Sequence, residues 1–283
     1  MNQLLLCTDL DRTLLPNGPQ PESRQAREYF RNFVNRDEVI LVYVTGRHKA
    51  LVQEAIDIYR IPQPNFVIAD VGSTIYMVDE GNWGYWQQWE SEIGKEWSGQ
   101  TSNDIHALLR DIKDLRLQER SKQNKHKLSY YVPIYVKQDK LAEKIENKLG
   151  AHGIRANLIW SIDESTNIGL LDILPASASK RQAIEFLAQQ LGLDLDHTVF
   201  AGDSGNDISV MASPIHSVLV ANASREVKEQ AIKEAIKNQQ QQSLYVARGN
   251  CLGMNGNYSA GILEGVVHYI PSLERYIVDS GEL

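Results

Sequence analysis

Short apolar runs alternate with amphipathic stretches along the first 70 residues. The runs at 3–8, 39–44 and 66–69 have the length of strands that are covered on both faces of a sheet. The stretches at 24–34 and 48–59 have helical spacing. Strands and helices that alternate at these intervals predict a parallel sheet with crossover helices.

Mixed elements replace this pattern in the middle of the chain. Residues typical of strands gather at 72–76, 83–89, 129–136 and 157–162, and helical segments at 103–113 and 140–149 separate them. This mixture predicts an inserted α+β subdomain.

The parallel pattern resumes in the last third of the chain. It predicts helices at 180–191, 225–237 and 260–269, strands at 198–201 and 217–220, a polar linker at 238–242 and a Gly/Asn-rich loop at 248–258. We therefore predict an α/β fold, with a doubly wound, Rossmann-like parallel-sheet core and a smaller inserted α+β cap. Residues 1–80 and 173–283 are assigned to the core, and residues 81–172 to the cap.

The composition is that of a globular protein, and it limits the partners. Of 283 residues, 42% are hydrophobic and 23% charged. The formal net charge of -7 disfavours a nucleic-acid partner, and it means that an anionic substrate needs local cations or a metal. No stretch has the length of a membrane span or a signal peptide, so we expect a cytoplasmic protein without a membrane partner. Cys7 and Cys251 are expected to be buried thiols.

Candidate chemistry begins at Asp9 and Asp11, directly after the first predicted strand. Two carboxylates at this spacing can point to the same side, where they repel unless a cation or a proton lies between them. Mg²⁺ prefers such carboxylates together with a phosphate oxygen, and an aspartate can itself attack phosphorus. The alternative interpretation is a surface turn with two capping acids.

Three further segments carry polar residues that suit phosphate chemistry. Thr45, Gly46 and Arg47 follow the second strand, where the hydroxyl can donate and the glycine allows close approach, although a helix N-cap gives the same pattern. Lys180 starts a helix and can pair with phosphate or carboxylate, although most lysines are simply solvated. The turn 202–207 can present Asp203 and Asp207 to a metal. Because ligand sites lie beyond the carboxyl ends of parallel strands, these segments are expected to converge.

Together and in this order, the four segments resemble the signature motifs of the haloacid dehalogenase superfamily of phosphotransferases. The resemblance implies that Asp9 is the nucleophile and a metal ligand, and that Asp11 is the general acid/base with its carbonyl on Mg²⁺. It implies phosphate and charge-balancing roles for Thr45 and Lys180, and Asp203 as the third metal ligand. Asn206 and Asp207 are implied to support the metal, and Thr13, Gly46, Arg47 and Asn206 are assigned to the substrate side of the site.

The insert lies where this superfamily carries its larger α/β cap, typical of sugar-phosphate phosphatases. Within that group the chain is similar to sucrose-phosphate phosphatases of the cyanobacterial and plant kind. The matching segments are QLLLCTDLDRT, TGR, DVGSTIY, KLSYY, LLDILP, GDSGNDI and SAGILEGVVHYI. The resemblance implies a magnesium-dependent phosphatase that hydrolyses a sugar phosphate, with sucrose 6-phosphate as the expected substrate and an aspartyl-phosphate as the intermediate.

Two positions depart from the family pattern and leave the sugar open. Arg12 stands where asparagine is usual, and His48 stands where serine is common. Mannosylfructose phosphate and a glucosylglycerol-type precursor are alternative substrates. Association with an upstream sugar-phosphate synthase is a possible partnership, and a monomer is the default expectation.

The cap offers two candidate contacts to the sugar. Trp83, Tyr85, Trp86 and Trp89 either stack on sugar rings or pack the cap and its hairpin. The basic run 120–127 either draws anions into the cleft or forms a solvated loop, and Lys127 and Tyr130 are the preferred substrate contacts.

Two classes of protein compete with the phosphatase interpretation. A phospho-accepting signalling module also combines acidic residues, a hydroxyl and a lysine on a doubly wound sheet, but it needs no cap-sized insert. A scaffold that keeps the fold without catalysis is the third possibility, although the acids and Lys180 are all present.

Overall fold

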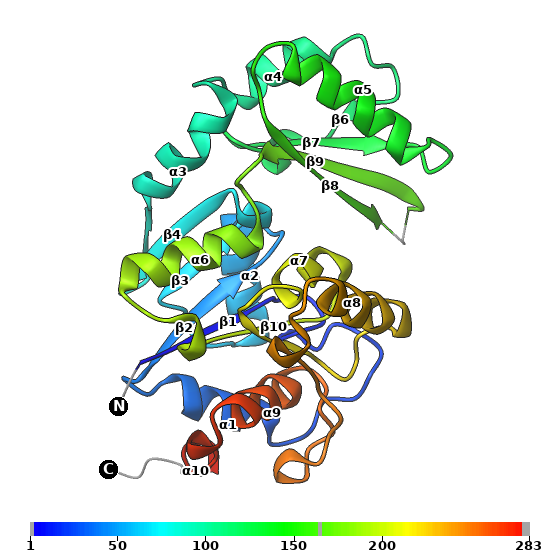
Figure 1. Ribbon diagram of the computed structural model, residues 1–283. Helices are drawn as coiled ribbons and strands as arrows, with labels where there is room; N and C mark the ends of the chain where they lie inside the picture. The colour runs from blue at the N-terminus through cyan, green and yellow to red at the C-terminus, as the bar shows by residue number, and fades with distance from the viewer. Residues whose placement is uncertain (1–2, 164–165, 279–283) are drawn as a thin grey trace.

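The computed structural model describes residues 3–163 and 166–278, which contain an eight-stranded core sheet and a four-stranded cap sheet (Figure 1). The core strands are β1 Leu4–Thr8, β2 Val39–Val44, β3 Phe66–Ala69, β4 Thr74–Asp79, β5 Asn82–Tyr85, β10 Thr198–Gly202, β11 His216–Leu219 and β12 Leu244–Val246. Their order across the sheet is β12-β11-β10-β1-β2-β3-β4-β5. Neighbours from β12 to β3 are parallel, and β4 and β5 are added antiparallel at one edge.

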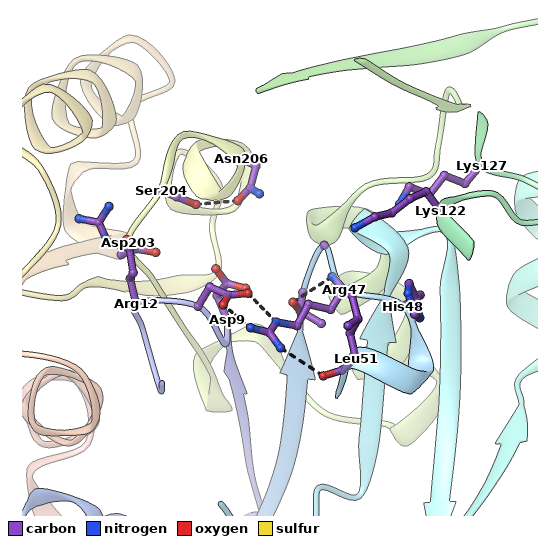
Figure 2. A pocket seen from close by; sticks show the side chains of 13 residues that line it. Asp9, Arg12, Arg47, His48, Leu51, Lys122, Lys127, Asp203, Ser204 and Asn206 are labelled. Atoms are coloured by element: carbon purple, nitrogen blue, oxygen red, sulfur yellow. Dashed lines mark hydrogen bonds and ion pairs between the residues drawn. The ribbon is translucent and has the colours of Figure 1, made fainter. Parts of the chain in front are cut away.

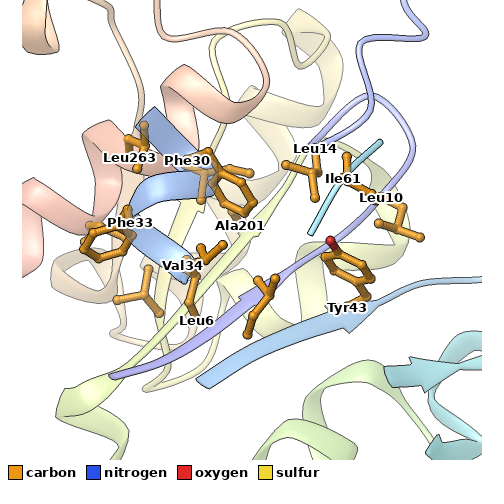
Figure 3. Packing of buried hydrophobic residues seen from close by; sticks show 14 of the residues in the cluster. Leu6, Leu10, Leu14, Phe30, Phe33, Val34, Tyr43, Ile61, Ala201 and Leu263 are labelled. Carbon is orange, nitrogen blue, oxygen red and sulfur yellow. The ribbon is translucent and has the colours of Figure 1, made fainter. Parts of the chain in front are cut away.

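Helices cover both faces of the core sheet, because strand residues alternate between two hydrophobic clusters. In β1, Leu4 and Leu6 face one cluster while Leu5 and Cys7 face the other. Figure 3 shows the first cluster, where Phe30 and Phe33 pack near Leu6. The helices on that side are α1 Ala26–Val34, α2 Lys49–Tyr59, α9 Ser259–Tyr269 and α10 Glu274–Val278, and those on the other are α6 Lys180–Leu191, α7 Ile208–Met211 and α8 Arg225–Lys237.

The cap has its own sheet and its own hydrophobic core. Its strands are β6 Arg116–Leu117, β7 Leu128–Val132, β8 Ala156–Asp163 and β9 Ile168–Pro175, in the order β6-β7-β9-β8. Leu128, Tyr130 and Val132 alternate along β7 and are buried in one cluster with residues of α4 Ser102–Leu109 and α5 Gln138–Gly150. Helix α3 Gln87–Gly94 leads from the core into the cap (Figure 1).

The α/β fold class is confirmed, and β2, β3, α6 and α8 have the predicted bounds. Other elements differ from the prediction. The strand expected at 83–89 ends at Tyr85 and gives way to α3, and the strand expected at 129–136 ends at Val132, before Pro133, which has no N–H for a sheet. Strands β9 and β12 were not predicted.

The domain boundaries remain a prediction, but sheet membership argues against a boundary at residue 81. The hairpin of β4 and β5 extends the core sheet, with Tyr76 opposite Tyr85. The first residues assigned to the cap therefore belong to the core, because a period-two pattern cannot tell which sheet a strand joins.

Both cysteines are free, and Cys7 is buried whereas Cys251 is half-buried. None of the helices formed within 3–163 and 166–278 combines the length and the apolar composition needed to cross a bilayer.

Candidate active site

The carboxyl ends of β1, β2 and β10 meet at one edge of the core sheet, beneath the cap. Thr8 at the end of β1 pairs with Tyr43 of β2 and with Ala201 of β10. The segments that follow these strands open onto a cleft of about 330 Å³ (Figure 2). It is lined by Asp9, Asp11, Arg12, Thr45, Gly46, Arg47, His48, Leu51, Lys122, Lys127, Asp203, Ser204 and Asn206.

Three buried carboxylates gather at the floor of the cleft. Oxygen atoms of Asp9, Asp203 and Asp207 lie within 4.8 Å of one another. Lys180 joins them from the first turn of α6, with its Nζ 2.7 Å from Asp207 Oδ1 and 3.3 Å from Asp9 Oδ1. The predicted convergence of the β1, α6 and β10 segments is therefore present in the structure.

Lys180, together with Arg12 at 3.6 Å from Asp203, supplies two positive charges against three carboxylates. Burial raises the pKa of Asp9 well above its usual range; Lys180 opposes this rise, and Asp207 and Asp203 add to it. Burial and the charge of Asp207 raise the pKa of Asp203 to about 7. Burial alone would lower the pKa of Lys180, but Asp207 and Asp9 outweigh it and raise that pKa. The cluster therefore has unmet negative charge, which a divalent cation can neutralise.

Asp207 is already saturated with hydrogen bonds. Its Oδ1 accepts from Lys180, and its Oδ2 accepts from the backbone N–H groups of Asp203 and Ser204 at 3.2 and 3.1 Å and from Ser204 Oγ at 3.0 Å. A Cβ at Gly202 would lie 2.6 Å from Asp207 Oδ2, so only glycine leaves room for this carboxylate. This arrangement fits the supporting role expected for Asp207 better than direct metal ligation.

The carboxylate of Asp11 turns away from the cluster and pairs with Arg47. Arg47 Nε donates to Asp11 Oδ2 at 2.7 Å, Nη2 donates to Oδ1 at 2.6 Å, and Asn17 also donates to Oδ1. Burial raises the pKa of Asp11, but these hydrogen bonds and the Arg47 charge outweigh it, so the pKa is lowered. In this arrangement the Asp11 carboxylate is held by Arg47 and Asn17 and is not part of the carboxylate cluster.

The other residues predicted from the core motifs divide into two groups. Thr45, Gly46 and Asn206 line the cleft as expected, and the Asn206 side chain accepts from Lys180 Nζ at 3.1 Å. Thr13 is fully buried and donates to Asp203 Oδ1 at 3.2 Å. It orients a carboxylate and does not line the cleft, so the expected substrate contact of Thr13 is not supported.

The two preferred cap residues also separate. Lys127 lines the cleft, but its Nζ is buried 3.5 Å from Asp70 of the core and 3.9 Å from Asp172 of β9. Tyr130 is 1% exposed in the cap core, where its hydroxyl bonds with His106 Nδ1. The prediction of Tyr130 as a substrate contact is therefore wrong for this arrangement, because the alternation of β7 turns it inward.

The aromatic residues at 83–89 do not line the cleft: Trp89 is buried, Trp83 and Trp86 are half-buried, and Tyr85 is 64% exposed. The ring centroids of Trp86 and Trp89 lie 6.1 and 5.0 Å from that of Phe186 in α6. Trp83 and Tyr85 lie against Tyr76 of β4. The packing interpretation is confirmed for Trp89, and none of the four residues supports sugar stacking in this cleft.

Sequence reasoning did not single out Lys122 or Ser204 as residues of the cleft. Lys122 comes from the cap as one residue of the basic run, and only tertiary contacts distinguish it from its neighbours. Arg12 lines the cleft with its Nε 3.6 Å from Asp203 Oδ2, so this departure from the family pattern lies beside the carboxylate cluster (Figure 2).

Comparisons with known proteins show which family the chain resembles along its length. The family profile described as sucrose-6F-phosphate phosphohydrolase matches residues 2–270. A protein of Nitrosococcus oceani named as a HAD-like hydrolase is 48% identical over 275 residues, which are 97% of this chain and 74% of that protein. Sucrose-phosphatase 2 of Nicotiana tabacum is 28% identical over 80% of this chain, and the chain spans 52% of its length.

A solved structure extends the similarity to the fold and the cap. The sucrose-phosphatase of Synechocystis, in complex with sucrose and phosphate, matches 95% of this chain and 98% of its own, with a TM-score of 0.73 and 25% identity. The chain belongs to the sucrose-6F-phosphate phosphohydrolase family and is a phosphatase of the haloacid dehalogenase type.

Proposed function

We propose that this phosphatase hydrolyses sucrose 6-phosphate to sucrose and phosphate, with Mg²⁺ as cofactor and an aspartyl-phosphate as intermediate. The observation that carries the proposal is the buried group of Asp9, Asp203 and Asp207 with Lys180, at the floor of the cleft of a chain in this family. The likeness to the Synechocystis sucrose-phosphatase supports the choice of sugar.

The proposed reaction has two displacements at phosphorus. A carboxylate oxygen of Asp9 attacks the phosphorus, and the bond to the sugar oxygen breaks. Asp11 gives that alkoxide a proton and then takes one from water, whose oxygen attacks the phosphorus and releases phosphate from Asp9. Lys180 holds Asp9 in place and offsets charge beside it.

Asp11 must leave its pair with Arg47 and take up a proton from solvent before it can protonate the sugar oxygen. The side chain of Asp11 faces Arg47 in the present arrangement and lies at the edge of the cleft. A rotation of Asp11 toward the sugar oxygen, with Arg47 free to meet the phosphate, connects the two states.

The residues present fit a magnesium ion. Asp9 and Asp203 have oxygen atoms close together, and burial raises the pKa of both carboxylates, so the site has unmet negative charge. Asp9, Asp203 and the Asp11 carbonyl would hold the ion, with Asp207 supporting them. When bound, Mg²⁺ neutralises carboxylate charge and polarises a phosphoryl oxygen.

Phosphate release from a panel of esters tests the proposal. The panel compares sucrose 6-phosphate with mannosylfructose phosphate, glucosylglycerol phosphate and hexose phosphates, each with Mg²⁺ and with EDTA. We expect the highest kcat/KM for sucrose 6-phosphate and no turnover in EDTA. Equal rates across the panel would reject the choice of sugar, and undiminished activity in EDTA would reject the metal role.

A further inference from the structure

Four arginine and lysine side chains line the cleft, and three of them face a carboxylate. The pairs are Arg47 with Asp11 at 2.6 Å, Lys127 with Asp70 at 3.5 Å and Arg12 with Asp203 at 3.6 Å. Within 3–163 and 166–278, Lys122 has no carboxylate oxygen within 4.0 Å of its Nζ. Among the four cations of the cleft, the one without an ion pair therefore comes from the cap, where its charge acts on Glu119 only from a longer range.

The backbone of Lys122 is fixed to the cap sheet. It closes the short 3₁₀ turn Arg120–Lys122, where its N–H donates to the Glu119 carbonyl at 2.9 Å. Ser129 Oγ of β7 donates to the Lys122 carbonyl at 3.2 Å. These bonds fix the main chain of Lys122, so its half-buried side chain extends from a fixed position on the cap.

The side chain of Lys122 extends from the cap into the cleft, above Arg47 and His48 (Figure 2). Burial lowers the pKa of His48, and the charge of Lys122 lowers it further. The turn at 45–47 lines the same cleft and is the expected phosphate cradle. The ammonium group therefore faces the part of the cleft where a phosphate would enter.

We propose that Lys122 binds the phosphate group of the substrate from the cap, whereas Lys127 holds the cap to the core. A phosphate ester brings two negative charges toward a floor that is already rich in carboxylates, so a cation on the opposite wall lowers the cost of binding. Lys127 already forms ion pairs with Asp70 of the core and Asp172 of the cap. The inference rests on the proposed phosphatase site but not on the identity of the sugar.

Titration calorimetry with inorganic phosphate and Mg²⁺ tests this division directly. We expect Lys122→Met to weaken phosphate binding about tenfold, the usual loss for one charge-assisted hydrogen bond. Lys122→Arg is expected to recover most of the affinity. Lys125→Met is the matched control, because Lys125 lies in the same run but pairs with Glu90 outside the cleft, and it should change binding less than about twofold.

Product inhibition separates the phosphate from the sugar. We expect Lys122→Met to raise the inhibition constant of phosphate and to leave that of sucrose unchanged. Wild-type affinity for phosphate in Lys122→Met would overturn the proposal, and so would a loss confined to sucrose. The thermal midpoint of each variant is measured as well, and Lys122→Met should match the wild type because its side chain has no ion pair to lose.

The choice of sugar can fail while this inference stands. If sucrose 6-phosphate is not turned over but phosphate binding still falls in Lys122→Met, the substrate proposal fails alone. If sucrose 6-phosphate is turned over and phosphate binds Lys122→Met normally, the role of Lys122 fails alone.

Discussion

Lys180 is a buried lysine with two carboxylate partners. It is 2% exposed, and its Nζ contacts both Asp9 and Asp207 at the start of α6. A buried charge is tolerated when partners offset its desolvation, and removal of one partner leaves the others unpaired. The residue therefore supports both the fold and the chemistry of the cluster.

Lys180→Met should cost about 3–5 kcal/mol in the free energy of unfolding and abolish phosphatase activity, because two carboxylates lose their cation. Urea unfolding measures the first effect. Arg181→Met is the control: its pair with Glu185 is partly exposed, so its removal should cost about 0.5 kcal/mol or less. A Lys180→Met protein as stable as the wild type would contradict the role of this ion pair.

Binding of Mg²⁺ at the proposed site should depend on pH because of Asp203. Its pKa of about 7 in the metal-free protein means that it holds a proton at pH 6 and has mostly lost it at pH 8. Because Mg²⁺ must displace that proton, its apparent affinity should rise about tenfold from pH 6 to pH 8. The same pKa shift affects stability. The free energy of unfolding of the metal-free protein should fall as pH rises from 4 to 7, because the unfolded state loses the Asp203 proton at lower pH than the folded state does.

Calorimetry of Mg²⁺ binding at the two pH values checks this expectation. Asp79→Asn, at the exposed end of β4, is the control and should keep the full pH dependence. Equal affinities at pH 6 and pH 8 would show that Asp203 is already ionised at pH 6.

At the scale of elements, the turn Asp70–Gly72 links three parts of the molecule. The Asp70 N–H donates to the Arg47 carbonyl at 3.0 Å, and the Asp70 carboxylate meets Lys127 of the cap. A Cβ at Gly72 would lie 2.3 Å from the Ser179 backbone, directly before α6. Asp70, Val71 and Gly72 all have positive φ. This conformation is unfavourable for Asp70 and Val71, so the contacts around the turn must stabilise it.

Gly72→Ala should therefore displace the start of α6 and with it Lys180. We expect a loss of about 2–5 kcal/mol in stability, from the left-handed conformation and the backbone clash together. Gly81→Ala is the matched control, since Gly81 also has positive φ but a Cβ there would meet nothing within 4 Å. It should cost about 1–2 kcal/mol. Similar losses for both variants would show that the clash is relieved elsewhere.

Sequence patterns predicted elements well where the local signal and the tertiary environment agree. Helix α6 follows the Ser179 N-cap and ends at Gly192 in the left-handed conformation, so both ends are marked by local residues. Strand β12 is three residues long after a polar run, and β5 follows a turn that looks like the start of the insert. Strands from distant parts of the sequence determine which sheet β5 and β12 join, and local sequence patterns carry no information about those strands.

The site shows the same division. Asp9, Thr45 and Asp203 each follow a strand of a parallel sheet, so the topology alone brings them together. The positions of Lys122 and Asp70 in the site depend on how the cap packs over the core, and the spacing of residues along the chain does not predict that packing. The substrate contact predicted for Tyr130 was wrong because alternation along a cap strand does not tell which of its two faces points toward the cleft and which toward the interior of the cap.

At the scale of the whole molecule, few polar contacts span cap and core. Asn124 of the cap donates to Ser73 Oγ at 3.1 Å and to Thr74 Oγ1 at 3.3 Å, and Lys127 contacts Asp70. These bonds lie next to the cleft, so they set the angle at which the cap meets the phosphate cradle.

Asp70→Asn should loosen the cap without unfolding the core. The charge-assisted contact to Lys127 is lost, and amide hydrogen exchange at 124–127 should become about tenfold faster, which corresponds to about 1.4 kcal/mol. Asp79→Asn, at the exposed end of β4, should leave that exchange unchanged. Unaltered exchange in Asp70→Asn would assign the cap position to Asn124 alone.

The sheet order carries a consequence for synthesis on the ribosome. Strand β1 lies between β2 and β10, and the latter pairs Leu5 with Thr198. At roughly 5–20 residues per second, β1 waits on the order of ten seconds or more for that neighbour. The nascent chain carries Asp9, the proposed nucleophile, long before Asp203 and Lys180 exist, and the cap is complete first. Activity is therefore withheld until the last third of the chain has been translated and folded.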